Sequence, residues 1–239
     1  MQTVALSLYR FTGWRKAWAF AQMGMARRAL AGLPGLEFHK MFGTGTGEGF
    51  TPVPNLAVYA LMTVWPDGAT ARARLAEAPV FARYRRRAAE TADLLLSPVS
   101  SRGAWDGQAP FRTDGDARPS PIAVLTRATL HPSAMRGFWR NVPGIEGTIR
   151  GEDQLLMKVG MGEVPWLQQV TFSIWQDDRA MQDFAYRSQH HREAIRRVRE
   201  GGWFKEELYA RFAVTSVEGL WEGRPLAATL ARGAQPLAN

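Results

Sequence analysis

Histidine is the residue type with which this chain could hold a redox metal. The 239-residue sequence contains four His and no Cys, which excludes disulfide bonds, Cys-ligated zinc, iron–sulfur clusters and thiolate-ligated haem. His190 and His191 are adjacent and would point about 100° apart on a helix, unlike the i, i+4 pair of a zinc site. His39 is expected on a strand and His131 in a turn. The candidate for chemistry is therefore a single imidazole.

His191 lies in a stretch with helical periodicity. It shares one face with Ala194, Ile195 and Val198, at spacings of i+3, i+4 and i+7, so this face is expected to pack on a sheet. An imidazole that points into an apolar slot between a helix and a sheet is suited to bind a haem iron. A core histidine that is hydrogen-bonded to a carbonyl oxygen explains the same pattern, and the residues alone leave both interpretations open.

The chain contains an internal repeat of about half its length. Four pairs of segments recur in the same order, 110 to 118 residues apart: Arg10 with Arg127, 40–43 with 158–160, 57–67 with 167–177, and 103–107 with 219–223. Four matches in order indicate a duplication. When Trp65 is aligned with Trp175, Phe81 falls opposite His191, so only the second copy carries this imidazole.

Each half is expected to contain strand, helix, two strands, helix and strand. The strands are expected over 4–11, 36–42, 56–65 and 93–99, and then over 122–130, 154–160, 168–175 and 208–217. The helices are expected over 14–30, over 70–89 with a break at Pro79, over a short segment after Pro132 with Ser133 as its cap, and over 178–199. This order predicts an α+β fold of two ferredoxin-like βαββαβ repeats. The repeats are expected over 1–106 and 121–239, with 107–120 as a linker.

The N-terminal helix carries a stripe of large apolar residues. Trp14, Trp18, Ala21 and Met25 recur at i, i+4, i+7 and i+11, which predicts the face that packs in the core. An apolar entrance for a long substrate is the alternative interpretation, because Trp and Met form adaptable apolar walls.

The balance of charge is basic. The chain has 30 Lys and Arg against 22 Asp and Glu, a formal net charge of +8, which favours an acidic protein or an anionic membrane as partner. No nucleic-acid-binding module is recognisable, so no nucleic acid partner is expected. No apolar run approaches the roughly 18 residues of a membrane span, and the N-terminus lacks the pattern of a signal peptide. These features predict a cytoplasmic chain.

Several long strings of this sequence resemble those of one known family. They lie at 40–52, 162–165, 169–175 and 203–212, and the similarity extends from residue 1 to about residue 223. The chain is similar here to the spheroidene monooxygenases, the acyclic carotenoid 2-ketolases of purple photosynthetic bacteria. The resemblance implies a fold of the dimeric α/β-barrel type that binds haem b in its C-terminal half. The family's His-x-Glu-Ala-Ile pattern falls on His191 to Ile195, which implies that His191 binds the iron and Ile195 lies beside the haem.

The resemblance also implies a reaction. Spheroidene would be oxidised at C-2 to spheroidenone through two hydroxylations and loss of water, and each hydroxylation would consume O₂ and two electrons. Because the chain has no Cys for an iron–sulfur cluster of its own, reduced ferredoxin is the expected electron donor, and an acidic ferredoxin would be attracted to the basic surface. A substrate dissolved in the bilayer implies peripheral contact with the inner or intracytoplasmic membrane.

Further residues are candidates for the haem site. Arg127 at a strand end, with Thr171 and Ser173 on one side of a strand, could stabilise negative charge that develops on oxygen. Lys158 or Arg197 could pair with the haem propionates. Ordinary positions in a sheet are the alternative interpretation of these residues. Two other functions also stay open: a cofactor-free monooxygenase or non-catalytic member of the same barrel superfamily, and a haem or carotenoid carrier without turnover.

Overall fold

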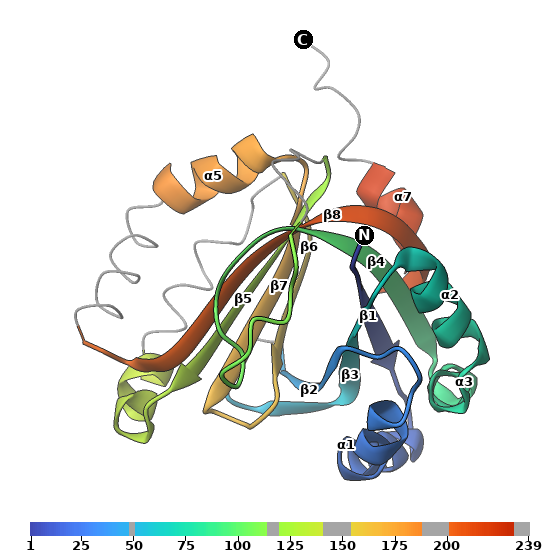
Figure 1. Ribbon diagram of the computed structural model, residues 1–239. Coiled ribbons are helices and arrows are strands. Elements are labelled where there is room, and N and C mark those ends of the chain that lie inside the picture. Colours follow the sequence, from blue (N-terminus) through green and yellow to red (C-terminus); the bar gives the residue numbers. More distant parts are fainter. Residues whose placement is uncertain (48–50, 114–119, 141–153, 188–200, 232–239) are drawn as a thin grey trace.

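The strands of this chain form a closed antiparallel barrel (Figure 1). The computed structural model describes residues 1–47, 51–113, 120–140, 154–187 and 201–231. The first half contributes β1 (Thr3–Arg10), β2 (Phe38–Gly45), β3 (Pro54–Trp65) and β4 (Glu90–Gly103). The second half contributes β5 (Ile122–Leu130), β6 (Leu155–Gly162), β7 (Gln168–Trp175) and β8 (Phe204–Trp221), and the short β9 (Arg224–Pro225) follows.

The two halves repeat one strand order. The first half runs β4-β1-β3-β2 and the second runs β8-β5-β7-β6, with antiparallel pairing throughout. The halves join at two seams, a short one between β2 and β6 and a long one between β4 and β8. The predicted fold of two ferredoxin-like repeats forming one barrel is confirmed. The division of the chain at 107–120 stays a prediction.

Alternate residues of each strand fill the barrel with apolar side chains. Leu6 and Leu8 of β1 meet Phe172 of β7 and Phe212 of β8 in one continuous core, and each of them is at most 1% exposed. The intervening residues of each strand point outward, because side chains alternate between the two faces of a sheet. Each half therefore presents an outer face that helices can cover.

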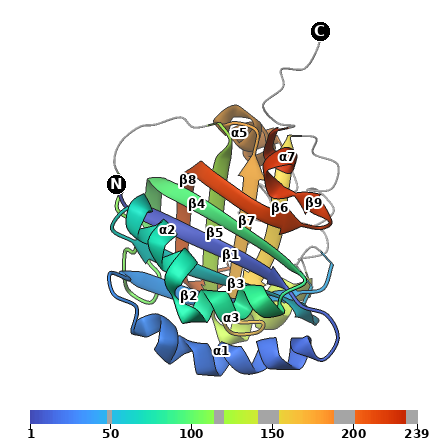
Figure 2. The ribbon, with the colours of Figure 1, turned by 90° about the vertical axis from the view of Figure 1, so that its right-hand side faces the viewer.

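Three helices cover the outer face of the first half (Figure 2): α1 (Arg15–Ala31), α2 (Gly68–Glu77) and α3 (Pro79–Arg87). Asp67 caps α2 by accepting a hydrogen bond of 2.8 Å from the Thr70 amide, and Pro79 begins α3. The predicted break at Pro79 is confirmed, since proline is favoured in the first turn of a helix and disrupts its interior.

The second half has different helical cover. Its described helices include α5 (Asp178–Arg187), on the outer face, and α7 (Leu226–Ala231), whose Leu226 and Leu230 join the barrel core. Residues 135–140 are also helical, as predicted for a short segment after Pro132. A 3₁₀ turn, η1 (Pro132–Ala134), follows β5. The predicted cap by Ser133 is wrong, because Ser133 lies inside this turn and His131 precedes it without a side-chain hydrogen bond. Pro132 favours the start of this turn without such a cap, because its fixed φ suits the first position.

The predicted core stripe of the N-terminal helix is also wrong. The buried residues of α1 are Ala19, Gln22, Ala26 and Leu30, whereas Trp14 is 75% and Met25 is 62% exposed, Ala21 is exposed and Trp18 is partly buried. The outer face beneath α1 carries the bulky rings of Tyr9, Phe11 and Tyr59. Small side chains let the helix approach these rings closely, so the large ones point elsewhere.

The strand register shows that two residues matched in the sequence repeat do not occupy equivalent positions in the structure. Lys158 lies opposite Ser173, and its counterpart opposite Thr63 is His39, whereas Lys40 lies opposite Met62. The predicted equivalence of Lys40 and Lys158 is therefore wrong by one residue, which places them on opposite faces of their sheets. Lys158 is on the outer face and Lys40 points into the barrel.

Candidate functional site

The outer face of the second half is built from smaller side chains than the outer face of the first. Four bulky residues correspond, by strand register, to smaller ones: Tyr9 to Ala128, Tyr59 to Gln169, Met41 to Gly160 and Leu61 to Thr171. In the first half all four bulky side chains are at most 4% exposed and fill the space beneath the helices. The second half lacks this filling at the same four positions.

The described helical segments of the second half contact the two ends of this outer face (Figure 1). At one end, α5 is joined to β8 by an ion pair of 3.1 Å between Asp178 and Arg211, and its Phe184 ring lies 5.0 Å from that of Trp175. At the other end, the Phe138 ring of segment 132–140 lies 6.3 Å from that of Phe204. The residues Gly160 and Thr171 belong to the middle of the face, between these two contacts.

Three of the candidate residues lie together on this outer face. Thr171 is flanked by Gly160 and Thr126, and Ser173 is flanked by Lys158 and Val124. The Ser173 hydroxyl accepts a hydrogen bond of 2.9 Å from the Trp175 indole, and Thr63 accepts the same bond from Trp65 in the first half. The contact of Ser173 is therefore a property of the repeated fold, while Thr171 replaces a buried leucine. His191, Ile195 and Arg197 lie outside the residues that the structure describes.

The structure does not bring Arg127 together with Thr171 and Ser173. On β5, Leu125 belongs to the barrel core, and Arg127 shares its inward direction by alternation. The Arg127 side chain is 0% exposed and forms ion pairs with Glu206 and, at 3.1 Å, with Asp106. It thus lies on the opposite face of the sheet from the two hydroxyl groups.

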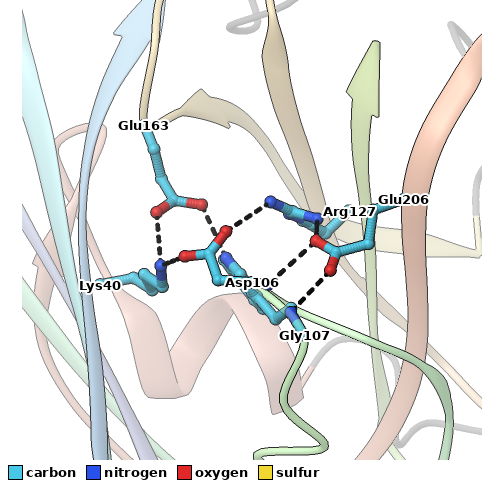
Figure 3. Close-up of polar contacts among 7 residues, drawn as sticks. Lys40, Asp106, Gly107, Arg127, Glu163 and Glu206 are labelled. Atoms are coloured by element: carbon cyan, nitrogen blue, oxygen red, sulfur yellow. Dashed lines mark hydrogen bonds and ion pairs between the residues drawn. The ribbon is translucent and has the colours of Figure 1, made fainter. Parts of the chain in front are cut away.

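Arg127 is part of a network of five charged side chains at one end of the barrel (Figure 3). Its guanidinium bridges Asp106 and Glu206. Asp106 also pairs with Lys40, whose ammonium lies 2.9 Å from Glu163. Two cations and three carboxylates alternate, so each charge has a partner of opposite sign within the network.

The same network holds the turn that follows β4. The Glu206 carboxylate accepts hydrogen bonds from the amides of Asp106 at 2.9 Å and Gly107 at 2.7 Å. The Trp105 indole donates a 2.7 Å hydrogen bond to Glu163 and lies 5.6 Å from the Arg127 guanidinium. A turn of the first repeat is therefore bound by residues of the second, and we name this arrangement the Trp105 clasp.

A reciprocal arrangement holds the turn that follows β8. The Glu90 carboxylate accepts hydrogen bonds from the amides of Glu222 at 3.1 Å and Gly223 at 2.8 Å, and it pairs with Arg10 at 2.8 Å. The Arg10 guanidinium lies 4.9 Å from the Trp221 ring. This Trp221 clasp binds a turn of the second repeat to the first, so the barrel is fastened twice across its long seam.

The pKa values of Glu206 and Glu90, the carboxylates that bind the two turns, are shifted in the same direction. Burial by itself would raise the pKa of Glu206 and that of Glu90. The two backbone amides and the arginine that bind each carboxylate outweigh burial and lower both pKa values, because hydrogen bonds and cations favour the charged form. Glu206 and Glu90 therefore stay ionised well below neutral pH.

The sequence did not predict the two clasps, although it contains the recurrent segments that form them. The recurrent segments 103–107 and 219–223 and the two arginines marked the duplication. What the sequence pattern could not show is that each segment docks on the other copy. Register also shows that Arg10 corresponds to Thr129 and not to Arg127, which lies one pleat deeper in the barrel.

Gly103 lets the chain enter the Trp105 clasp. Its φ of +96° belongs to a region that favours glycine, and an added Cβ would collide with the Glu207 carbonyl oxygen of β8. We expect Gly103→Ala to lower the free energy of unfolding by about 3 kcal/mol or more, since both strain and a backbone clash arise. Urea unfolding followed by tryptophan fluorescence measures this loss.

Gly107 provides the matched control for this substitution. Its φ is +74°, but no atom lies within 4 Å of an added Cβ. Gly107→Ala should therefore cost only the backbone strain of about 1–2 kcal/mol. Equal losses for the two alanine variants would show that the close approach of β8 at Gly103 does not matter for stability.

The two described histidines lie apart from the outer face of the second half. Burial, followed by the charges of Lys40 and Arg27, lowers the pKa of His39 on β2. His131 is exposed and precedes η1. Within the described ranges, no group of three or more His, Cys, Asp or Glu residues could hold a metal ion. The helices in those ranges are also too short or too polar to cross a membrane.

Comparisons of sequence show strong similarity to one group of enzymes. The chain is 48% identical to the spheroidene monooxygenase of Rhodobacter capsulatus, covering 95% of this chain and 96% of that protein. It is 46% identical to that of Cereibacter sphaeroides, covering 94% and 70%, and 34% identical to that of Rubrivivax gelatinosus, covering 87% and 80%. Residues 127–219 also match a domain of unknown function, DUF3291.

Comparisons of structure support the fold. A crystal structure of aldoxime dehydratase matches with a TM-score of 0.60 at 14% identity, covering 90% of this chain and 82% of that one. The aldoxime dehydratase OxdRE in complex with butyraldoxime matches with a TM-score of 0.54 at 11% identity, covering 89% and 79%. These likenesses show that the same barrel architecture occurs in proteins of low sequence identity to this chain.

Proposed function

Because this chain belongs to the spheroidene monooxygenase family, we propose that it oxidises an acyclic carotenoid at a haem held on the outer face of the β5–β8 sheet. The enzyme class and the carotenoid substrate follow from the three relatives, which match most of the chain. The location rests on one structural observation: four bulky residues that fill the outer face of the first half are replaced by Ala128, Gln169, Gly160 and Thr171 in the second.

The residues of this face fit a flat apolar cofactor. Gly160 and Ala128 carry little or no side chain on this face, and alignment of the repeats in the sequence places His191 where the first repeat has Phe81. His191 would bind the iron of haem b, with Ile195 beside the ring, and Lys158 or Arg197 would pair with the propionates. When bound, the haem would supply the activation of O₂.

The described side chains of this face have distinct tasks in this proposal. The Thr171 hydroxyl, on the same face as Gly160, would donate or accept the hydrogen bonds needed where charge develops on oxygen. Ser173 holds the Trp175 indole through its hydroxyl and thereby orients the floor of the site. Arg127 lies on the inner side of the sheet, where its ion pairs with Asp106 and Glu206 stabilise the barrel.

The reaction would proceed through two successive hydroxylations of the same carbon. In the first, a methylene C–H bond is replaced by C–OH, and O₂, two electrons and two protons are consumed as one water is released. A second round on the same carbon gives a gem-diol, which loses water to leave the ketone. The electrons would come from reduced ferredoxin, whose acidic surface would be attracted to a chain with a formal net charge of +8. The polyene would be taken from a membrane that the enzyme contacts peripherally.

The experiment that tests this proposal is turnover by the purified, haem-loaded full chain. Spheroidene in detergent is incubated with reduced ferredoxin and isotopically labelled O₂, and the products are analysed by mass spectrometry. We expect a ketone at C-2, with labelled hydroxylated intermediate, only when haem, O₂ and the reductant are all present. Turnover without haem would establish the cofactor-free alternative, while binding of haem and carotenoid without O₂ consumption would establish a carrier.

A further inference from the structure

The exposed side of α1 is unusually apolar for a helix on a protein surface. Trp14, which precedes the helix, is 75% exposed, and Phe20 and Met25 are each 62% exposed. The remaining exposed uncharged positions between these residues are occupied by Ala17, Ala21 and Gly24 rather than by polar residues. Surface helices ordinarily carry polar side chains on this side, so this face is suited to an apolar partner.

The charges around this face are of one sign. Arg15, Lys16, Arg27 and Arg28 are exposed on α1, and the helix contains neither Asp nor Glu. The neighbouring α3 ends in Arg85, Arg86 and Arg87, and Arg15 donates a hydrogen bond of 3.3 Å to the Arg87 carbonyl oxygen. Large apolar side chains are thus interspersed with cations on the exposed side of α1, and the helix carries no compensating acid.

We propose that this face of α1, which we name the α1 face, docks on the surface of an anionic lipid bilayer. Its aromatic and thioether side chains would enter the boundary between headgroups and acyl chains, while the Arg and Lys side chains would extend to lipid phosphates. A helix of 17 residues is about 25 Å long, so α1 can lie flat along the membrane plane. It lies on the outside of the barrel (Figure 2).

The charges favour a bilayer over a second copy of the chain. A symmetric dimer through the α1 face would bring four cations of one copy against four of the other, and like charges across an interface are unfavourable. Anionic lipid supplies the opposite charge and an apolar layer together. This inference deepens the proposed function, which requires access to a substrate in the bilayer, but docking is measured without any turnover.

Cosedimentation of the full chain with vesicles tests the α1 face. We expect binding to phosphatidylglycerol-containing vesicles, weaker binding to pure phosphatidylcholine, and a decrease with salt. The triple variant Trp14→Ser/Phe20→Ser/Met25→Ser should bind anionic vesicles at least about tenfold more weakly. The matched control replaces exposed apolar residues elsewhere, Leu56→Ser/Val164→Ser/Leu220→Ser, and should bind as the parent chain does.

A second pair of variants separates charge from apolar contact. Arg27→Gln/Arg28→Gln should weaken binding to anionic vesicles about tenfold or more, while Arg179→Gln/Arg224→Gln, exposed on other elements, should change it little. Circular dichroism of each variant establishes that it is folded.

Two outcomes would overturn the inference. One is equal vesicle binding by the parent chain and the folded α1-face triple variant. The other is a change of oligomeric state in sedimentation velocity without any change in vesicle binding, which would assign the face to a second copy. Oxidation of detergent-dispersed carotenoid should survive in the triple variant and oxidation of vesicle-embedded carotenoid should fall. If the proposed function is wrong, the parent chain will show neither activity but will still bind vesicles.

Discussion

His191→Ala is expected to abolish the haem absorption spectrum of the purified protein and to lower ketone formation by more than about 100-fold. Loss of residues that only support a metal ligand already costs 10- to 100-fold in affinity or activity, and loss of the ligand itself should cost more. The expectation follows from a replacement within the repeat, where Phe81 in the first copy is His191 in the second. Absorption spectroscopy and product analysis measure the two effects separately.

His190→Ala is the matched control for this experiment, because it removes an imidazole one residue away. The control should retain the haem spectrum and turnover. Added imidazole should restore part of the spectrum of His191→Ala, because the free base can occupy the space that the side chain leaves. If His191→Ala retains both spectrum and turnover, the iron is held by another residue and the proposed ligand is refuted.

Arg127→Ala should be among the most destabilising single substitutions in the chain. The Arg127 side chain is 0% exposed, and its removal leaves Asp106 and Glu206 without their shared cation. Breaking a buried ion pair costs about 3–5 kcal/mol, and because Asp106 and Glu206 are partly exposed we expect a loss near the lower end of this range. Urea unfolding of the full chain, followed by tryptophan fluorescence, measures this loss.

The Trp221 clasp supplies the control within the same molecule. Arg10 makes the corresponding contact with Glu90 but is 30% exposed, since it lies one pleat nearer the barrel end than Arg127 does. Arg10→Ala should therefore cost about 1 kcal/mol, as expected for a solvent-screened pair. Similar losses for the two arginines would contradict the view that depth in the barrel decides the cost. The double variant Arg127→Ala/Glu206→Ala should lose less than the sum of the single losses.

Much of the architecture could be predicted from the sequence because its causes are local. Strand β5 over 122–130 and β7 over 168–175 have the expected bounds, since alternating apolar residues and flanking turn residues act within a few positions. Pro79 divides two helices by the same kind of local effect. The second helix of the second half was expected over 178–199, and the structure describes α5 over 178–187.

Predictions of the direction in which a side chain points were wrong where the segment packed against it decides that direction. The stripe of Trp14 and Met25 has the spacing of a core face, yet α1 packs through Ala19 and Ala26 because bulky rings already occupy the sheet beneath it. Likewise, sequence matching paired Lys40 with Lys158, and a shift of one residue in strand register places them on opposite faces. Both errors concern faces, which depend on contacts between distant segments.

The candidate site divides in the same way. The sequence by itself determined that the chain is duplicated, that it has no thiolate, and that one imidazole distinguishes its second copy, because these are properties of residue identity. Only the tertiary structure decided that Thr171 and Arg127 face opposite sides of one sheet, and that the recurrent Trp turns fasten each repeat to the other. Such facts depend on strand register and barrel closure, which arise from contacts between segments far apart in the chain, such as Glu90 and Glu222 at a separation of 132 residues.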